Sequence, residues 1–472
     1  MTDSSKKIPL YVDLDGTLIK TDLLWESLIR LIKQNPLLLF VLPFWLLKGK
    51  AGFKEAIAQR VDLDVTLLPY HQEFLNYIKD LNRPLILVTA SVEKYAKQVA
   101  EHLGIFSEVM ATAGGINLSG STKLKAIQEK VGGKFGYAGN AKIDCTLWDQ
   151  ADEIIMVNPP GSVISRYQNR KEIKLFIGKK NPLRTLIKTI RLHQWMKNLL
   201  IFVPLVLAHR IMNSDTLVTT LIAFLSFGCC ASSVYICNDL ADLDSDRAHA
   251  TKCNRPLASG NLSIGTGILI FVIMLTLGVA LATQLSLGFQ IVLGVYFVST
   301  TLYSFWLKSL VLIDVVVLSL LYTLRIFAGG MATGLEVSQW LLTFSLFIFF
   351  SLSLAKRYSE LKKLEESHGV QSKGRGYRTD DMHQVASFGS SCGFISVLVM
   401  SLYINSDKVT RLYNHPQILW AICPVLLYWT ARVWLLAHRG LLHEDPVVFA
   451  LTDRVSYVVG LIAVIAIAAA SY

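Results

Sequence analysis

The sequence predicts a chain of two parts: an N-terminal α/β domain with a helical cap, followed by an all-α domain of about nine transmembrane helices. Hydrophobic residues make up 52% of the 472 residues, only 17% are charged, and the mean hydropathy is +0.44. This composition is too apolar for a soluble protein of that length. Short apolar strands stand near the N-terminus. From residue 184 onward, apolar stretches recur at about the length that a membrane-spanning helix requires.

Charge and cysteine usage narrow the class of partner. The formal net charge is +11, but the basic residues stand next to apolar stretches. We therefore expect anionic lipid and phosphorylated substrates as partners, and no nucleic acid. The seven cysteines show no metal-type pairing, and several lie inside apolar runs, which predicts free, reduced thiols. The polar N-terminus runs straight into a strand, so we expect no signal peptide.

The first motif is a pair of aspartates at the end of the strand predicted over residues 8–12. Asp13 and Asp15 are separated by one residue. This arrangement puts one carboxylate in line as a nucleophile and leaves the other close enough to act as acid and base, with a metal bridging to phosphate. The pair therefore predicts chemistry on a phosphate ester.

Three later motifs offer further groups for that phosphate. The strand predicted over residues 84–88 ends at Thr89, whose hydroxyl can bind a phosphoryl oxygen. Lys123 and Lys125 open a helix and can neutralise the same phosphate. Asp144 follows a glycine turn and supplies a further carboxylate.

In this order the four motifs resemble those of the haloacid dehalogenase superfamily, which has a Rossmann-like α/β fold and consists mostly of phosphatases. By that resemblance Asp13 is the nucleophile, Asp15 the acid and base, and Thr89 the phosphate ligand. Lys125, or failing that Lys123, is the motif lysine. The resemblance gives the metal ligands as Asp13, Asp15 and Asp144.

One position departs from that pattern. Asn140 stands where many members of the superfamily have an aspartate. An amide can still coordinate a metal, but it gives up one negative charge. A degenerate, non-catalytic domain is therefore the alternative to an active phosphatase.

An apolar insertion separates the first two motifs. Residues 23–47 are rich in Leu, Ile, Phe and Trp, and their densest part, 36–47, is shorter than the ~20 residues that span a bilayer. Pro36 and Pro43 interrupt it further. We expect a helical cap that lies on the membrane surface. A pair of ordinary buried core helices is the alternative.

Composition also predicts the domain boundaries. Residues 158–183 begin with Asn-Pro-Pro-Gly and continue into a basic run, which is typical of a linker. The predicted domains are therefore 1–157 and 184–472. Nine apolar segments are expected in the second domain, at 198–212, 217–238, 264–283, 286–304, 310–331, 339–356, 384–404, 416–436 and 455–471.

The polar connections between these segments alternate in charge. Those after the second, fourth, sixth and eighth segments carry most of the lysines and arginines, and the others are short and nearly uncharged. The positive-inside bias places the basic connections in the cytoplasm, together with the N-terminal domain. We expect an integral protein of a bacterial inner (plasma) membrane with its C-terminus on the far side.

A carboxylate-rich stretch follows the second apolar segment. On a continuing helix Asn238, Asp242 and Asp246 are four residues apart and line one face, with Asp239 beside that face and Asp244 behind it. Carboxylates this close repel one another unless a cation lies between them, and hard oxygen ligands suit Mg²⁺. The cations that follow, which could bind phosphate, are Arg247, His249, Lys252 and Arg255. A solvated acidic loop capped by basic residues is the alternative.

Residues 238–260, NDLADLDSDRAHATKCNRPLASG, resemble the first aspartate-rich motif of the UbiA-type membrane prenyltransferases, and the resemblance covers about the C-terminal 60% of the chain. It implies Asp239 and Asp242 as catalytic residues. It implies metal ligation by Asn238, Asp239, Asp242 and Asp246.

The second polar segment, residues 355–381, lacks the carboxylates four residues apart that most members acting on aromatic acceptors carry there. Its KRYSEL sequence, with the later Tyr377 and Arg378, resembles the decaprenyl-phosphate phosphoribosyltransferase branch of the superfamily, as do YSFWLK and LRIFAGG upstream. The substrate-binding residues implied for the membrane domain are Lys197, Arg247, Lys252, Arg255, Lys308, Arg325, Lys356, Arg357, Glu360, Tyr377 and Arg378.

Arg325 lies deep in an apolar segment. It follows Asp314 by eleven residues, so both face the same way about 16 Å apart along a helix. A buried arginine is costly unless it faces a polar cavity. We prefer phosphate binding for Arg325, and a structural ion pair between helices is the alternative.

Together the motifs predict a magnesium-dependent transferase that joins a polyprenyl phosphate to the phosphoribosyl group of phosphoribosyl pyrophosphate, with a fused phosphatase that dephosphorylates the product. The alternatives are transfer of a prenyl group from a polyprenyl diphosphate to an aromatic acceptor, and a lipid carrier or scaffold with a vestigial site. Whether the chain forms a homo-oligomer is left open by the sequence.

Overall fold

The computed structural model describes residues 8–168, 173–178, 181–366, 375–442, 446–450 and 452–471. The chain divides into two compact units. The first, called the N-terminal unit below, comprises Met1–Ile190 and Tyr235–Phe271. The second, called the helical unit, comprises Arg191–Val234 and Val272–Tyr472.

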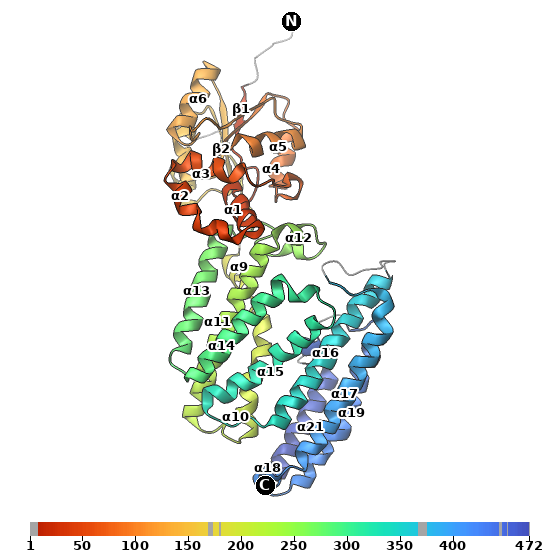
Figure 1. Ribbon diagram of the computed structural model, residues 1–472. Coiled ribbons are helices and arrows are strands. Elements are labelled where there is room, and N and C mark those ends of the chain that lie inside the picture. The colour runs from red at the N-terminus through yellow and green to blue at the C-terminus, as the bar shows by residue number, and fades with distance from the viewer. Residues whose placement is uncertain are drawn as a thin grey trace. The chain divides into compact units, whose positions relative to one another are not determined.

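The N-terminal unit is built on a six-stranded parallel sheet with the strand order β3-β2-β1-β4-β5-β6 (Figure 1). Its strands are β1 (Leu10–Val12), β2 (Leu85–Val92), β3 (Glu108–Thr112), β4 (Gly136–Gly139), β5 (Glu153–Val157) and β6 (Ile173–Phe176). The central strands are apolar and buried on both faces, as a parallel sheet covered by helices requires. β1 pairs with β2 on one side and β4 on the other, so the strand order reverses at β1 and creates a crevice at the carboxyl ends.

Helices connect these strands. They are α4 (Gln72–Lys79), α5 (Glu93–Leu103), α6 (Ser121–Val131), α7 (Cys145–Trp148) and α8 (Gly161–Tyr167). α8 and β6 lie inside the range expected to be a linker, and β6 extends the sheet by pairing Ile173 with Ile154. The aromatic ring of Phe176 packs against that of Phe74 at 5.4 Å, which gives β6 a place in the core. The sheet domain therefore continues to β6, and the outer domain boundaries stay a prediction.

The insertion after β1 folds as α1 (Leu23–Gln34), η1 (Pro36–Phe40), α2 (Leu42–Leu46) and α3 (Gly49–Ala58). The Asp22 side chain caps α1 by accepting from the backbone N–H groups of Leu24 and Trp25. Pro43 stands in the first turn of α2, where its missing N–H leaves no hydrogen bond unmade. The helical cap is confirmed as a set of short helices, each too short to span a bilayer.

Eight helices among the described residues are long and apolar enough to cross a membrane. They are α11 (Ser214–Ala241), α13 (Ile264–Ala282), α14 (Leu287–Phe305), α15 (Ile313–Thr333), α16 (Gln339–Glu366), α17 (Met382–Ile404), α19 (Ile422–His438) and α21 (Arg454–Ser471). The prediction of an integral membrane protein is confirmed by these helices.

The first of the nine expected segments is not a long helix. Its range falls on η4 (Leu192–Phe202), a 3₁₀ helix, and the five-residue α10 (Val203–Leu207), preceded by α9 (Pro182–Thr189). Arg191 enters η4 with a left-handed φ of 51°, and Pro204 lies in the first turn of α10. These two breaks explain why an apolar stretch of suitable length does not form one continuous α-helix.

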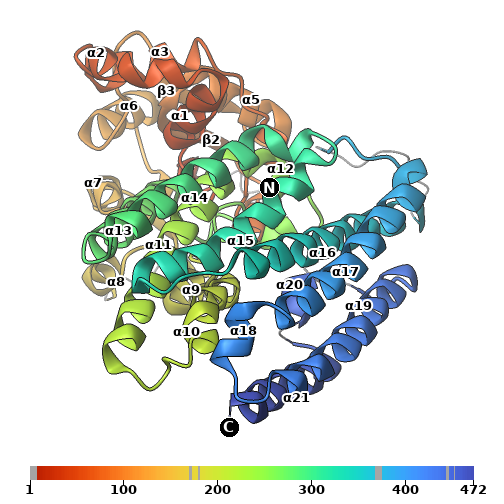
Figure 2. The ribbon, with the colours of Figure 1, turned by 60° about the horizontal axis from the view of Figure 1, so that its bottom comes forward.

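In the helical unit α15, α16 and α17 lie side by side, and α19 and α21 continue the bundle (Figures 1 and 2). Glycines permit the close approach of neighbouring helices. A Cβ on Gly389 would lie 2.1 Å from the indole of Trp434, and one on Gly278 would lie 2.8 Å from Cys230 Sγ. One side chain at either position would separate the helices.

Candidate functional sites

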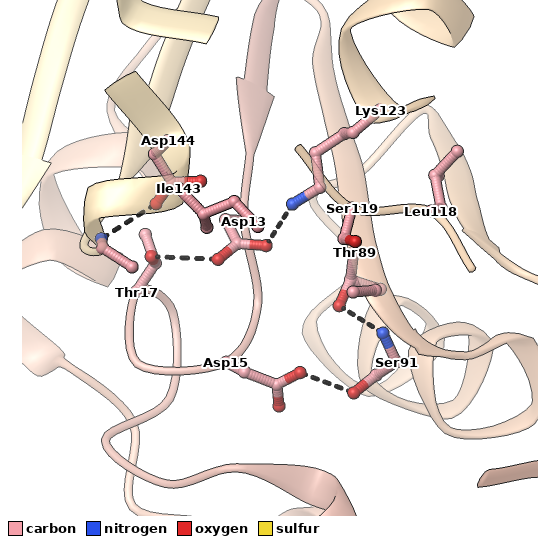
Figure 3. A network of polar contacts seen from close by, with 12 residues as sticks. Asp13, Asp15, Thr17, Thr89, Ser91, Leu118, Ser119, Lys123, Ile143 and Asp144 are labelled. Atoms are coloured by element: carbon pink, nitrogen blue, oxygen red, sulfur yellow. Dashed lines mark hydrogen bonds and ion pairs between the residues drawn. The ribbon is translucent and has the colours of Figure 1, made fainter. Parts of the chain in front are cut away.

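Asp13 lies at the carboxyl end of β1 and faces the crevice of the N-terminal unit (Figure 3). Its carboxylate accepts a hydrogen bond from Lys123 Nζ at 2.7 Å and one from the Thr17 hydroxyl at 3.4 Å. Burial raises the pKa of Asp13, the Lys123 ammonium lowers it, and the nearby negative charge of Asp144 raises it again. The expected nucleophile thus has a cation beside it and a second carboxylate close by.

Lys123, rather than the preferred Lys125, provides that cation. Lys123 is 4% exposed, and its ammonium also donates to the hydroxyl of Tyr137 at 3.2 Å. Lys125 is exposed to solvent on the same helix, α6. Residues two apart on a helix point in nearly opposite directions, so only one of the pair can reach Asp13.

Asp15 is fixed by two hydrogen bonds. It accepts from the hydroxyl of Ser91 at 2.5 Å and from the backbone N–H of Leu23 at 3.0 Å. Burial, and then the negative charge of Asp22, raise the pKa of Asp15 to about 7. A carboxyl with that pKa is partly protonated at neutral pH, which suits it to give a proton to a leaving oxygen.

Asp144 uses its carboxylate to shape the turn after β4. It accepts from the hydroxyl of Tyr137 at 2.9 Å and from the backbone N–H groups of Asn140 and Ala141 at 3.0 and 2.9 Å. The amide oxygen of Asn140 accepts from Thr17 at 3.2 Å. These oxygens accept hydrogen bonds from the protein, and no group of three metal-ligating side chains is gathered among the described residues. Metal ligation by Asp13, Asp15 and Asp144 therefore stays a prediction.

Thr89 is completely buried near the end of β2, and its hydroxyl accepts from the backbone N–H of Ser91 at 3.0 Å. The neighbouring Ala90 lines the cavity at this point. The predicted phosphate contact of Thr89 therefore stays a prediction. The neighbouring hydroxyl of Ser91 donates to Asp15.

A cavity of about 690 Å³ opens in front of these residues. Asp13, Asp15, Lys123 and Asp144 line it. Lys54 of α3 also lines it and donates to the backbone oxygen of Ala90 at 2.7 Å. No sequence motif singled out Lys54, because it stands in the cap insertion and reaches the site only through the fold.

The aspartate-rich segment runs from the end of α11 into α12 (Leu243–Arg247), with Asp242 between them. The hydrogen bonds from Asp242 N to Asn238 O and from Asp246 N to Asp242 O keep the backbone nearly helical across the break. Asp239 and Asp246, seven residues apart, face the same way and are 5% and 2% exposed.

Arg255 joins these two carboxylates. Its Nη1 lies 3.0 Å from Asp239 Oδ1 and 2.6 Å from Asp246 Oδ2. Asn238 and Asp242 are half-buried on the same segment. Asp242 lies 4.0 Å from Lys33, and Asp244 lies 2.9 Å from Arg30. Among the described residues no three carboxylate, histidine or cysteine side chains are gathered closely enough to hold a metal ion, so Mg²⁺ binding at this segment stays a prediction.

Arg247 does not face a substrate site. Its guanidinium forms a buried two-point ion pair with Glu26, at 2.6 and 3.1 Å, and donates to the backbone oxygen of Ala258 at 3.1 Å. These partners use its donors on the protein itself, because a planar guanidinium matches a carboxylate at two points. Substrate binding by Arg247 stays a prediction, and these contacts would have to be exchanged for a substrate. Lys252 is exposed to solvent.

Arg357 also has protein partners. It is 1% exposed, and its Nε and Nη1 lie 2.6 Å from Asp314 Oδ2 and 2.6 Å from Glu360 Oε2. The hydroxyl of Tyr377 donates to Asp314 at 2.6 Å, and Arg375 contacts Glu360 at 3.0 Å. Since two carboxylates already neutralise Arg357, the network holds α15, α16 and the segment after α16 together.

The other expected ligands of the helical unit are scattered. The described hydrogen-bond partners of Arg325 are the neutral groups of Asn198, Leu321 and Tyr296. Phosphate binding and an ion pair between helices both stay predictions for Arg325. Lys197 is 8% exposed and lies 5.6 Å from the ring centre of Tyr322. Lys308 and Lys356 are half-buried, and Arg378 is exposed.

Comparison with known proteins adds a family context. A model of the UbiA prenyltransferase family matches residues 199–439. An uncharacterised protein, y4nM of Sinorhizobium fredii, is 38% identical over 462 residues, which are 96% of this chain and 89% of that protein. Nodulation protein NoeC of Azorhizobium caulinodans is 34% identical over 59% of this chain and 91% of its own length.

A third relative has a more specific name. Decaprenyl-phosphate phosphoribosyltransferase of Corynebacterium glutamicum is 37% identical over 186 residues, 39% of this chain and 56% of that protein. The present chain thus matches about half the length of that relative.

Proposed function

This chain belongs to the UbiA prenyltransferase family, and on that premise we propose that it is a magnesium-dependent membrane transferase. It joins a polyprenyl phosphate to the phosphoribosyl group of phosphoribosyl pyrophosphate and releases pyrophosphate. The observation that carries the proposal is the pair of buried carboxylates, Asp239 and Asp246, which share a contact with Arg255. A divalent cation with a phosphorylated substrate completes such a set.

The choice of phosphoribosyl donor has two supports. The last turns of α16 carry the Arg357 network, and residues 355–381 lack a second set of carboxylates four residues apart. A relative named decaprenyl-phosphate phosphoribosyltransferase matches 39% of the chain. Both favour this branch over transfer of a prenyl group to an aromatic acceptor.

In the proposed reaction one bond forms at the anomeric carbon of the donor and one breaks. An oxygen of the lipid phosphate attacks the anomeric carbon of the donor, and the bond from that carbon to the pyrophosphate oxygen breaks. Asn238, Asp239, Asp242 and Asp246 would hold Mg²⁺, which neutralises charge on the leaving pyrophosphate. The lipid phosphate is already anionic, so the acceptor needs no strong general base.

We propose a second activity for the N-terminal unit. The sugar of the product keeps its own phosphate, and Asp13 would attack that phosphorus while Asp15 protonates the leaving oxygen. Lys123 neutralises charge beside Asp13, and Asp13, Asn140 and Asp144 would hold a metal. The rival is an inert domain, because the Asn140 amide lacks the charge of an aspartate.

The transfer is tested by supplying membranes that contain the full chain with a polyprenyl phosphate and phosphoribosyl pyrophosphate labelled in the ribose. We expect label in the lipid fraction, and we expect chelation of divalent metal to abolish it. Label that stays in the aqueous phase, with transfer from a labelled polyprenyl diphosphate to an aromatic acceptor instead, would establish the other branch.

A further inference from the structure

Arg325 is a buried charge whose described contacts include no carboxylate. It lies on α15 and is 5% exposed. Its Nε donates to Asn198 Oδ1 at 3.0 Å, Nη1 to the backbone oxygen of Leu321 at 2.5 Å, and Nη2 to the hydroxyl of Tyr296 at 3.1 Å. All three acceptors are neutral, so the positive charge is not cancelled by a described group.

The side-chain amide of Asn198, which contacts Arg325, has an N–H group without a hydrogen-bond acceptor. Asn198 is 1% exposed, and its Nδ2 has no hydrogen-bond partner among the described residues. The amide cannot be turned over to satisfy it, because Nδ2 would then face the Nε–H of Arg325, donor against donor. A buried N–H without an acceptor is costly, so the site contains donors and positive charge that call for an acceptor.

The surroundings of the pair strengthen any interaction with an anion. Aromatic rings enclose the guanidinium, with centres at 5.4, 4.9 and 5.4 Å for Phe227, Tyr296 and Tyr322. Rings exclude water, and a charge attracts an anion more strongly in a medium of low polarity. The rings also stabilise the guanidinium of Arg325 by cation–π interactions while no anion is bound.

The backbone brings the pair together through a glycine. A Cβ on Gly329 would lie 2.0 Å from the backbone oxygen of Ile201, so the absence of a side chain lets η4 lie directly on α15. Arg325 is four residues before Gly329 and therefore on the same face of α15. Asn198 is three residues before Ile201, which is one turn of a 3₁₀ helix, so it shares the face that touches α15.

We propose that Arg325 and Asn198 form a binding site for a phosphoryl group, and that Asn198 decides its specificity. An amide at position 198 leaves the charge of Arg325 available, whereas an aspartate would neutralise it. The inference rests on the proposed function, since the phosphoryl group belongs to one of its two substrates. These are the lipid phosphate of the acceptor and the pyrophosphate of the donor.

The test measures thermal unfolding of the purified full-length chain with two probes, inorganic pyrophosphate and farnesyl phosphate. We expect one probe to raise the Tm of the wild type, which identifies the source of the phosphoryl group. Asn198→Asp should be at least as stable as wild type without ligand, because it gains an ion pair with Arg325. Its affinity for that probe should fall about tenfold to a hundredfold, the size of one or two charge-assisted hydrogen bonds.

Matched variants separate the site from general damage. Asn405→Asp makes the same change at an exposed residue at the end of α17, and it should keep the full ligand effect. Arg325→Lys keeps the charge but loses the forked donors, and it should weaken the same probe. If Asn198→Asp does not fold, Asn198→Leu replaces it, with the same loss of affinity expected.

Two results would overturn the proposal: variants at position 198 that bind the probe as tightly as wild type, or a wild type stabilised by neither probe. Transfer of labelled phosphoribosyl groups is measured in parallel. Binding that depends on Asn198, without any transfer in the wild type, would keep this site and refute the proposed function.

Discussion

Asp239 and Asp246 share one nitrogen of Arg255 in the aspartate-rich segment. Asp246→Asn should reduce transfer about 10²-fold or more if this carboxylate holds the catalytic metal, and Asp242→Asn should do the same. The measurement is the rate of label transfer to lipid at saturating Mg²⁺. Tm should fall, because Asp246→Asn loses the ion pair with Arg255, but the protein should stay folded since Arg255 keeps its contact with Asp239.

Asp244→Asn is the matched control. Asp244 belongs to the same segment, but its carboxylate pairs with Arg30 at 2.9 Å and is partly exposed. It should keep near-normal transfer. Equal activity in the Asp242, Asp244 and Asp246 variants would remove the metal assignment.

The two lysines of α6 make a second matched pair. Lys123→Ala should abolish hydrolysis of a phosphate ester by the N-terminal unit, because it removes the cation 2.7 Å from Asp13. Lys125→Ala should keep wild-type hydrolysis, since its side chain points into solvent. Phosphate release by the full chain from the phosphorylated glycolipid is the assay. A loss of activity in the Lys125 variant alone would reverse the assignment.

Single residues also show what the sequence could and could not predict. The motif around Asp13 predicts phosphate-ester chemistry, but the spacing of Lys123 and Lys125 allows either lysine to be the partner of Asp13. The structure places Lys123 beside Asp13. The roles of Arg247 and Arg357 depend on Glu26 and Asp314, which are 221 and 43 residues away in the sequence. Long-range partners of this kind leave no local pattern.

At the scale of elements, the cap carries an outward apolar surface. Trp45 packs into its core beside Leu31 and Phe53. The large side chains that point outward are Leu37, Phe40, Phe44 and Leu47, which are 70, 73, 67 and 84% exposed. The sequence left open a membrane-surface cap or a buried helix pair, and this exposure favours the first.

The cap should therefore contact lipid. A fluorophore on Phe44→Cys in the full chain, reconstituted in vesicles with anionic lipid, should be quenched by brominated acyl chains. The background has its accessible native cysteines replaced by serine. The same label on Lys134→Cys, also exposed in the N-terminal unit, should not be quenched. Equal quenching at both positions, or none at either, would rule out a bilayer contact through this surface.

The apolar helices show how much of the helix arrangement can be predicted from hydropathy alone. Seven of the eight long helices overlap their predicted ranges within a few residues, and the eighth, α16, continues ten residues beyond its range into the polar segment. Composition could not predict the 3₁₀ geometry of η4, because that depends on contact with α15 at Gly329. The apolar content of the segment was predicted correctly, and its conformation was not.

At the scale of the molecule, the chain leaves the N-terminal unit after Ile190 and returns to it at Tyr235. If α11 is one membrane crossing, η4 and α10 have to supply the other, which makes nine crossings with eight long helices. Labelling of single cysteines in intact cells should then place Lys252 and Lys363 in the cytoplasm and Ser338 outside. Protection of positions 363 and 338 from the same side would contradict this count.

Two sites in one chain suggest consecutive steps on one lipid. Tethering raises the effective concentration of a product at the second site to the millimolar range when the connection is short. The N-terminal unit would therefore act on the phosphorylated glycolipid before it diffuses away in the bilayer.

The most direct test of this account is the mass of the lipid product made from a polyprenyl phosphate and phosphoribosyl pyrophosphate by three forms of the full chain. Wild type should yield a polyprenyl phosphate that carries ribose without a further phosphate. Asp13→Asn should accumulate the same lipid with one phosphate more, and Asp246→Asn should yield neither. Identical phosphorylated lipid from wild type and Asp13→Asn would contradict the coupled phosphatase, and no ribose on the lipid in any form would contradict the central claim itself.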